Sequence, residues 1–135
     1  MTTQRKVCEK QISDPDFGKL NFQFSNKDRI LWSFDYLLFK LNTTVFIQGN
    51  DSCLDPTLKN LFMNLLANEE IVFTELQMAL QDFTVIDVDS FRERFTITEV
   101  TIWSANYDIT LLDTAENKKY IINIEDLKIQ DINIE

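Results

Sequence analysis

The chain has 135 residues, of which 44% are hydrophobic and 26% are charged, and its 13 basic and 22 acidic side chains give a net charge of -9. This length and composition suit a single globular domain with a hydrophobic core of its own. The sequence has no histidine, which excludes Ser-His and Cys-His catalytic pairs and every zinc site that uses histidine. Its two glycines are too few for a glycine-rich phosphate-binding loop.

The negative charge is concentrated in the C-terminal part of the chain. Residues 1–81 hold 10 acidic and 8 basic side chains, whereas residues 82–135 hold 12 acidic and 5 basic ones, so the net charges of the two parts are -2 and -7. Such a field repels nucleic-acid backbones and anionic membrane surfaces, and it attracts basic proteins. We therefore expect neither nucleic acid nor membrane as a partner. The simpler alternative is that the acidity keeps the protein soluble.

Two isolated cysteines, Cys8 and Cys53, bear on the compartment. The opening run MTTQRKVCEK is polar and lacks the apolar stretch of about 7–15 residues that a secretory signal requires. No window approaches the ~18 consecutive apolar residues of a membrane-spanning helix. We therefore expect a cytoplasmic protein with both thiols free, and a disulfide between the two cysteines is the alternative.

The N-terminal part predicts an antiparallel meander that follows an arm over residues 1–11. The run SDPDFG is rich in turn-forming residues and precedes the first strand. Three runs alternate apolar and polar residues or are rich in strand-forming residues: KLNFQFS, ILWSFDYLLF and NTTVFIQ. In the second run Ile30, Trp32, Phe34 and Tyr36 fall on one face. Because the connections are too short for parallel crossovers, these strands are expected to be antiparallel.

The middle of the chain predicts two helices. Asp55 followed by Pro56 is typical of a helix start, with aspartate as the N-cap and proline in the first turn. One apolar stripe then follows helical spacing: Leu58, Leu61, Phe62, Leu65 and Leu66. A second helix is expected from Asn68, as its cap, to about Phe83. Its inward residues are expected to be Val72, Leu76, Ala79, Leu80 and Phe83. The alternative is one kinked helix.

The C-terminal part returns to strands, in the runs FTITEV, TIWS, YDITLLD, KYIINIE and LKIQDINIE. In the last run Leu127 and Ile129 are in phase, whereas Ile132 and Ile134 are shifted by one residue. If both pairs face the core, a bulge or turn is expected near Gln130 and Asp131. The predicted fold class is therefore α+β, in a single domain over residues 1–135: an antiparallel meander, a helical pair and a second antiparallel β unit.

Pairs of neighbouring carboxylates are the remaining material for catalysis or for binding a hard metal ion. The pairs are Asp14 with Asp16, Asp87 with Asp89, and Glu125 with Asp126. None of them has the calcium-loop pattern. We expect the first pair to bond the backbone of its own turn, and the second to precede a short helix or strand with Ser90 as a cap. The sequence thus predicts no cofactor, no metal and no catalytic residue.

The run ISDPDFGKLNF, followed by Trp32, the strand TTVFIQG and the segment PTLKNLFMNLLANEEIVFTELQMALQDF, resembles a family of small bacterial domains of unknown function, over roughly residues 12–84. Members begin with an acidic residue, Phe-Gly and Leu, and continue with a helical segment of this layout. Such domains are similar to immunity proteins of polymorphic toxin and contact-dependent inhibition systems. The resemblance implies a non-catalytic cytoplasmic protein that blocks a toxin by tight association.

The resemblance and the charge agree, because many such toxins are nucleases, whose clefts are basic. We therefore expect an immunity protein that neutralises a cognate basic toxin through an acidic surface. Its partner-binding residues are expected to be Glu99, Asp108, Asp113, Glu125, Asp126 and Asp131. For the acidic sheet, the alternative is a solvated edge whose charges discourage aggregation. For the function, one alternative is a non-catalytic adaptor or homo-oligomeric module that pairs through a strand edge. The other is a carboxylate-based hydrolase, which needs two acids about 5–10 Å apart in a pocket.

Overall fold

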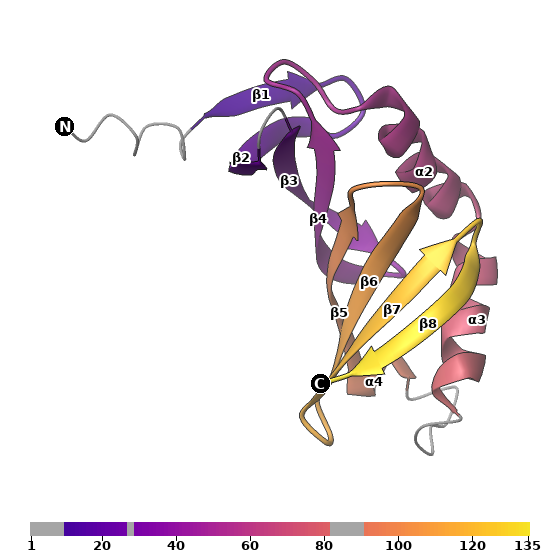
Figure 1. The fold of residues 1–135 in the computed structure, drawn as a ribbon. Helices are drawn as coiled ribbons and strands as arrows, with labels where there is room; N and C mark the ends of the chain where they lie inside the picture. Colours follow the sequence, from indigo (N-terminus) through magenta and orange to yellow (C-terminus); the bar gives the residue numbers. More distant parts are fainter. Residues whose placement is uncertain (1–9, 27–28, 82–90) are drawn as a thin grey trace.

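The structure is a computed structural model, and it describes residues 10–26, 29–81 and 91–135. In these residues a single eight-stranded sheet carries helices along one side (Figure 1). The strands are β1 (Gln11–Asp14), β2 (Gly18–Asn26), β3 (Arg29–Leu38), β4 (Leu41–Gly49), β5 (Phe95–Ile102), β6 (Asn106–Asp113), β7 (Lys118–Glu125) and β8 (Lys128–Ile134). The helices are α2 (Pro56–Ala67), α3 (Glu69–Leu80) and α4 (Phe91–Arg94).

The strands follow one another across the sheet in chain order, and every neighbouring pair is antiparallel except β4 and β5. These two strands are parallel, with Thr44 opposite Glu99 and Ile47 opposite Ile102. Parallel neighbours require a crossover connection, which the segment containing α2, α3 and α4 provides. The α+β class is therefore confirmed. The expectation of a separate second β unit is corrected, because the two meanders share one sheet.

The turn cluster after the N-terminal arm connects two strands, because an additional strand, β1, precedes it. The Asp14 carboxylate accepts hydrogen bonds from the backbone N–H groups of Asp16 and Phe17, at 2.9 and 3.1 Å. Gly18 then begins β2 with φ of 77°, a conformation that glycine adopts without strain. The expected turn-forming role is confirmed for Asp14, whereas the Asp16 carboxylate contacts Lys59 instead of the backbone of the turn. Of the expected arm, residues 1–9 lie outside the described residues and Gln11 belongs to β1.

Aromatic side chains fill the space between the sheet and the helices. Phe17 stacks on Phe34 with ring centroids 4.5 Å apart, and both contact Phe62 of α2. Toward the other end of the core, Phe73 of α3 lies edge-on to Phe91 of α4, which stacks on Phe95 with centroids 4.9 Å apart. Because ring pairs of this kind add attraction beyond burial, the helices are fixed against the sheet at both ends of the core.

The predicted start of the first helix is confirmed. Asp55 accepts hydrogen bonds from the N–H groups of Thr57 and Leu58, at 2.9 and 3.2 Å, and Pro56 is the first residue of α2. The expected apolar stripe faces the core, with Leu58, Phe62 and Leu65 buried and Leu61 and Leu66 partly buried. None of the helices in the described part of the chain has the length and apolar character that a membrane crossing requires.

Asn68 separates two helices rather than kinking one, as the two-helix prediction stated. Its expected capping role is corrected, because its side chain makes no cap hydrogen bond to α3. The Asn68 amide instead donates to the Asn64 carbonyl, at 2.8 Å, and so satisfies the C-terminal end of α2. Val72, Leu76 and Leu80 of α3 are buried as predicted. Phe83, Cys8, Asp87, Asp89 and Ser90, which also carried predictions, lie outside the described residues.

The predicted bulge in the last strand is confirmed. Asn123 pairs with Asp131 and Ile124 pairs with Ile129, so Gln130 has no residue opposite it on β7. The extra residue returns the alternation to phase, and Leu127, Ile129 and Ile132 pack against the core. Ile134, which was also expected to face the core, is 43% exposed.

Candidate functional site: the outer face of the sheet

The outer face of the sheet, opposite α2, α3 and α4, carries acidic, neutral polar and some apolar side chains. Side chains alternate across a strand, and the buried apolar residues of β3 to β8 occupy the inner face. The residues between them point outward. The partly or fully exposed polar ones from β3 to β8 include Asp35, Thr44, Glu99, Thr101, Asp108, Asn123, Asp131 and Asn133. The apolar side chains of Leu37, Phe46, Leu112 and Ile121 lie among them on the same face. This face therefore displays carboxylates, hydroxyls and amides on a rigid sheet.

Two of the predicted acids lie in one row across the outer face. Asp108 of β6 pairs with Asn123 of β7, which pairs with Asp131 of β8. The Asn123 amide donates to the Asp108 carboxylate at 2.9 Å. Two strand spacings place Asp108 and Asp131 about 10 Å apart. The Asn123 amide fixes the position of the Asp108 carboxylate without neutralising its charge, and Asp131 accepts a hydrogen bond from the Asn133 amide, at 3.3 Å.

A second row brings in an acid that the sequence reasoning missed. Glu99 of β5 lies opposite Thr44 of β4, and Thr44 lies opposite Asp35 of β3. The Thr44 hydroxyl donates to the Asp35 carboxylate at 3.3 Å. The signal for Asp35 was present in the alternation with Phe34 and Tyr36, but its relation to Glu99 required the β4–β5 pairing.

Two further predicted acids lie at the hairpin between β7 and β8. Glu125 ends β7, and Asp126 begins the two-residue turn, with φ of 54°. Both side chains are exposed. Asparagine and aspartate tolerate this left-handed conformation better than most residues. We define the carboxylate band as Asp35, Glu99, Asp108, Glu125, Asp126 and Asp131.

Asp113 does not belong to this band, and its predicted role at a partner surface is corrected. It is 0% exposed, and its two carboxylate oxygens accept hydrogen bonds from Nε and Nη2 of Arg94, at 2.9 and 2.8 Å. It also accepts from the backbone N–H groups of Ala115 and Glu116. These bonds, with the Arg94 contact first, lower the pKa of Asp113. Asp113 thus joins α4 to the β6–β7 turn inside the protein.

Ion pairs elsewhere in the structure involve other acids. Lys59 of α2 contacts Asp14 and Asp16 at 3.0 and 2.6 Å, and Lys118 contacts Glu116 at 3.3 Å. Among the residues that the structure describes, no ion pair involves a member of the carboxylate band. Lys119 of β7 shares the outer face at the far end of its strand. Of the band, Asp35, Glu125, Asp126 and Asp131 are exposed, and Glu99 and Asp108 are half-buried.

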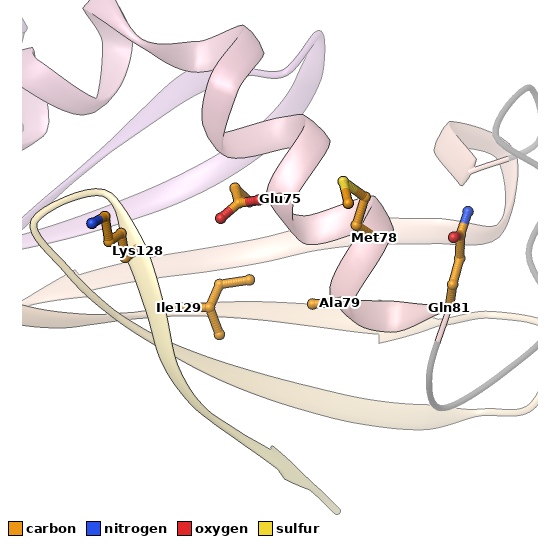
Figure 2. Close-up of a pocket in the computed structure, with 6 residues that line it drawn as sticks. All are labelled: Glu75, Met78, Ala79, Gln81, Lys128 and Ile129. Atoms are coloured by element: carbon orange, nitrogen blue, oxygen red, sulfur yellow. The ribbon is translucent and has the colours of Figure 1, made fainter.

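A groove of about 640 Å³ lies between α3 and β8, beside the edge of the sheet (Figure 2). Its lining residues are Glu75, Met78, Ala79, Gln81, Lys128 and Ile129. Figure 2 shows the first four on the helix side and the last two on β8. The lining contributes a single carboxylate, and the described ranges of the chain hold no cluster of side chains that could bind a metal ion.

Comparison of the chain with protein-family models, with curated proteins and with solved structures finds no match. No relative or structural neighbour therefore bears on the immunity-type function expected from the sequence. The function is inferred below from the surface of this chain.

Proposed function

We propose that this protein is an immunity-type inhibitor, which binds a cognate basic toxin domain of the nuclease class through the carboxylate band. The observation that carries the proposal is that six acids occupy one open face and its adjoining hairpin, and that none of them makes an ion pair with a described base. The protein acts in the cytoplasm in this account.

The physical basis is competition for the toxin's basic cleft. A nuclease must present positive charge to the phosphates of its substrate. Carboxylates on a sheet are held at fixed spacings, so they match such a cleft without first losing conformational freedom. Steering between opposite charges also raises the association rate, which an inhibitor needs when a toxin enters the cell.

Inhibition by binding requires no chemistry from this chain, and the site supports a non-catalytic role. Carboxylate-based hydrolysis needs two acids that converge in a pocket. Asp108 and Asp131 lie on the open face of the sheet on either side of Asn123. The α3–β8 groove is lined by Glu75 as its one acid. A second hollow, of about 340 Å³ along α3, has two exposed acids in its lining, Glu70 and Glu75. The open arrangement of Asp108 and Asp131 supports a binding surface.

The proposal is tested with the toxin domain encoded by the reading frame adjacent to this one. Purified toxin is titrated with this protein while its nuclease activity is followed. We expect the activity to disappear at about equimolar protein, because immunity complexes must be tight. Full nuclease activity in excess protein, or the lack of a basic toxin product from the adjacent frame, would overturn the proposal. Self-association without toxin binding would instead favour a homo-oligomeric adaptor.

A further inference from the structure

The last strand leaves one row of backbone hydrogen-bonding groups without a neighbour. In the described part of the chain, β8 pairs with β7 on one side and forms the edge of the sheet on the other. Lys119 and Glu135 exchange both backbone hydrogen bonds, at 3.1 and 2.8 Å. Such pairs alternate along an antiparallel ladder with pairs whose N–H and C=O groups point away from the partner strand. The backbone groups of Ile132 and Ile134 therefore face the open edge.

The edge is bordered by apolar side chains on the side of α3. Met78 of α3 is 59% exposed, and Ile134 of β8 is 43% exposed. Met78 and Ala79 of α3 line the groove together with Ile129 of β8 (Figure 2). A strand added to β8 would point alternate side chains toward this groove. An added strand could thus form backbone hydrogen bonds with β8 and place every second side chain against an apolar surface.

Charge indicates which strand would occupy the edge. Asp131 lies on the outer face of β8, Asp126 lies at its start, and Glu75 lines the groove on the other side. Lys128 is the base of this strand. A second copy of the chain would bring another acidic strand and another carboxylate band onto the same face, at a net charge of -9 for each copy. Like charges on adjacent strands are destabilising, so self-pairing is disfavoured and a basic strand is favoured.

We propose that the open edge of β8 is a strand-addition site for an extended segment that alternates apolar residues with lysine or arginine. The apolar side chains enter the α3–β8 groove, and the basic side chains lie on the outer face beside Asp131. This inference rests on the proposed function and deepens it, because it assigns the partner's docking mode. The toxin would supply one basic strand that continues the sheet.

The inference is tested without any toxin, through hydrogen exchange of the β8 amides. The probe is a synthetic eight-residue peptide that alternates valine with lysine, and its matched control alternates valine with glutamate. We expect saturating lysine peptide to slow exchange at Ile132 and Ile134 about tenfold or more, and the glutamate peptide to leave it unchanged. Absence of slowing, or equal slowing by both peptides, overturns the proposal. Slowing that grows with protein concentration alone assigns the edge to a second copy and also overturns it.

Variants distinguish the contribution of the β8 backbone to peptide binding from that of the side chains. Ile132→Pro removes an outward N–H and is expected to abolish the effect of the lysine peptide at Ile134, whereas Ile132→Ala retains the N–H and much of the effect. Ser13→Pro makes the same change at the opposite edge, in β1, and is expected to leave the effect intact. Should Ile132→Pro fail to fold, Met78→Gln at an exposed position of α3 tests the groove without adding a charge, with an expected loss of at least about tenfold in peptide affinity. Unchanged peptide affinity in Met78→Gln contradicts the proposal.

The toxin titration tests the immunity function, and the hydrogen exchange with the peptide tests the docking mode, so either result can be negative without the other. Peptide protection of β8 without neutralisation of the adjacent toxin would refute the immunity function and leave the strand-addition site. Neutralisation without peptide protection would refute the docking mode and leave the immunity function.

Discussion

At the scale of single residues, the sequence distinguishes acids from bases but not surface from interior. Asp113 was expected at the docking surface together with the other acids of the C-terminal part of the chain. The structure instead buries it against Arg94, nineteen positions earlier in the sequence. Nothing local marks this pair, because it depends on α4 lying beside the end of β6. By contrast, Asp108 and Asp131 follow the alternation of their strands and reach the outer face as expected.

The Asp113–Arg94 pair predicts a specific loss of stability. Asp113→Asn leaves the guanidinium without its buried counter-ion, and we expect it to reduce the free energy of unfolding by about 3 kcal/mol. Glu116→Gln is the matched control, because Glu116 contacts the same Arg94 at 3.0 Å and has a side chain that is 43% exposed. We expect this control to change stability by less than about 1 kcal/mol. Urea denaturation measures both, and equal losses would contradict the assigned roles.

The same pair predicts the pH dependence of folding. The pKa of Asp113 in the folded protein is lowered, chiefly by its hydrogen bonds from Arg94, below the ordinary value of 3.8. A carboxyl with a depressed folded pKa stabilises the protein above its unfolded pKa, and this contribution is lost as the pH falls through the folded pKa. Wild-type stability should therefore fall more steeply than that of Asp113→Asn below about pH 4. Parallel pH profiles of the two proteins would contradict this assignment.

A second residue-scale prediction concerns the turn between β3 and β4. Phe39 and Lys40 both have positive φ, 52° and 66°. Lys40 is exposed, so Lys40→Gly should raise the free energy of unfolding by about 0.5–1 kcal/mol, because glycine adopts this conformation without strain. Phe39 is 2% exposed and contacts Phe73, so Phe39→Gly should instead lower it by about 3 kcal/mol or more. Thermal denaturation compares them, and destabilisation by both changes would contradict the account.

At the scale of elements, the sequence predicted what local patterns determine. The Asp55–Pro56 helix start and the β8 bulge each depend on a few neighbouring residues, and both are confirmed. β1 was missed because QISD is short and lacks a clear alternation of large apolar residues. The pairing of β4 with β5 was also missed, because no local sequence feature indicates which strand pairs with the last strand of one meander.

The bulge gives a prediction at this scale. Deleting Gln130 would leave Ile129, Asp131 and Ile132 in regular alternation, so the fold should survive with a change in unfolding free energy within about 1 kcal/mol. Deleting Ile132 would turn Asn133 toward the core, and we expect a loss of about 2 kcal/mol or more. Circular dichroism during urea titration distinguishes them. If deleting Gln130 costs as much as deleting Ile132, the phase-restoring role of the bulge is wrong.

At the scale of the whole molecule, the single sheet determines what the acids can do. Two separate β units would have divided the carboxylate band, whereas the β4–β5 pairing places Asp35 and Glu99 on the same face as Asp108 and Asp131. The excess of negative charge and its location in the C-terminal part of the chain could be read from the sequence. The shared face could not be predicted, because it depends on long-range pairing across the crossover.

The central claim is that the carboxylate band steers a basic toxin domain onto this protein, and the association rate tests it most directly. The band variant carries Asp126→Lys and Asp131→Lys, and the control carries Asp51→Lys and Glu93→Lys, which make the same change in net charge at exposed positions elsewhere. Stopped-flow mixing with the toxin domain from the adjacent reading frame should show association slowed about tenfold or more for the band variant at low salt, and clearly less for the control. Equal rates for the wild-type protein and the band variant would contradict the claim.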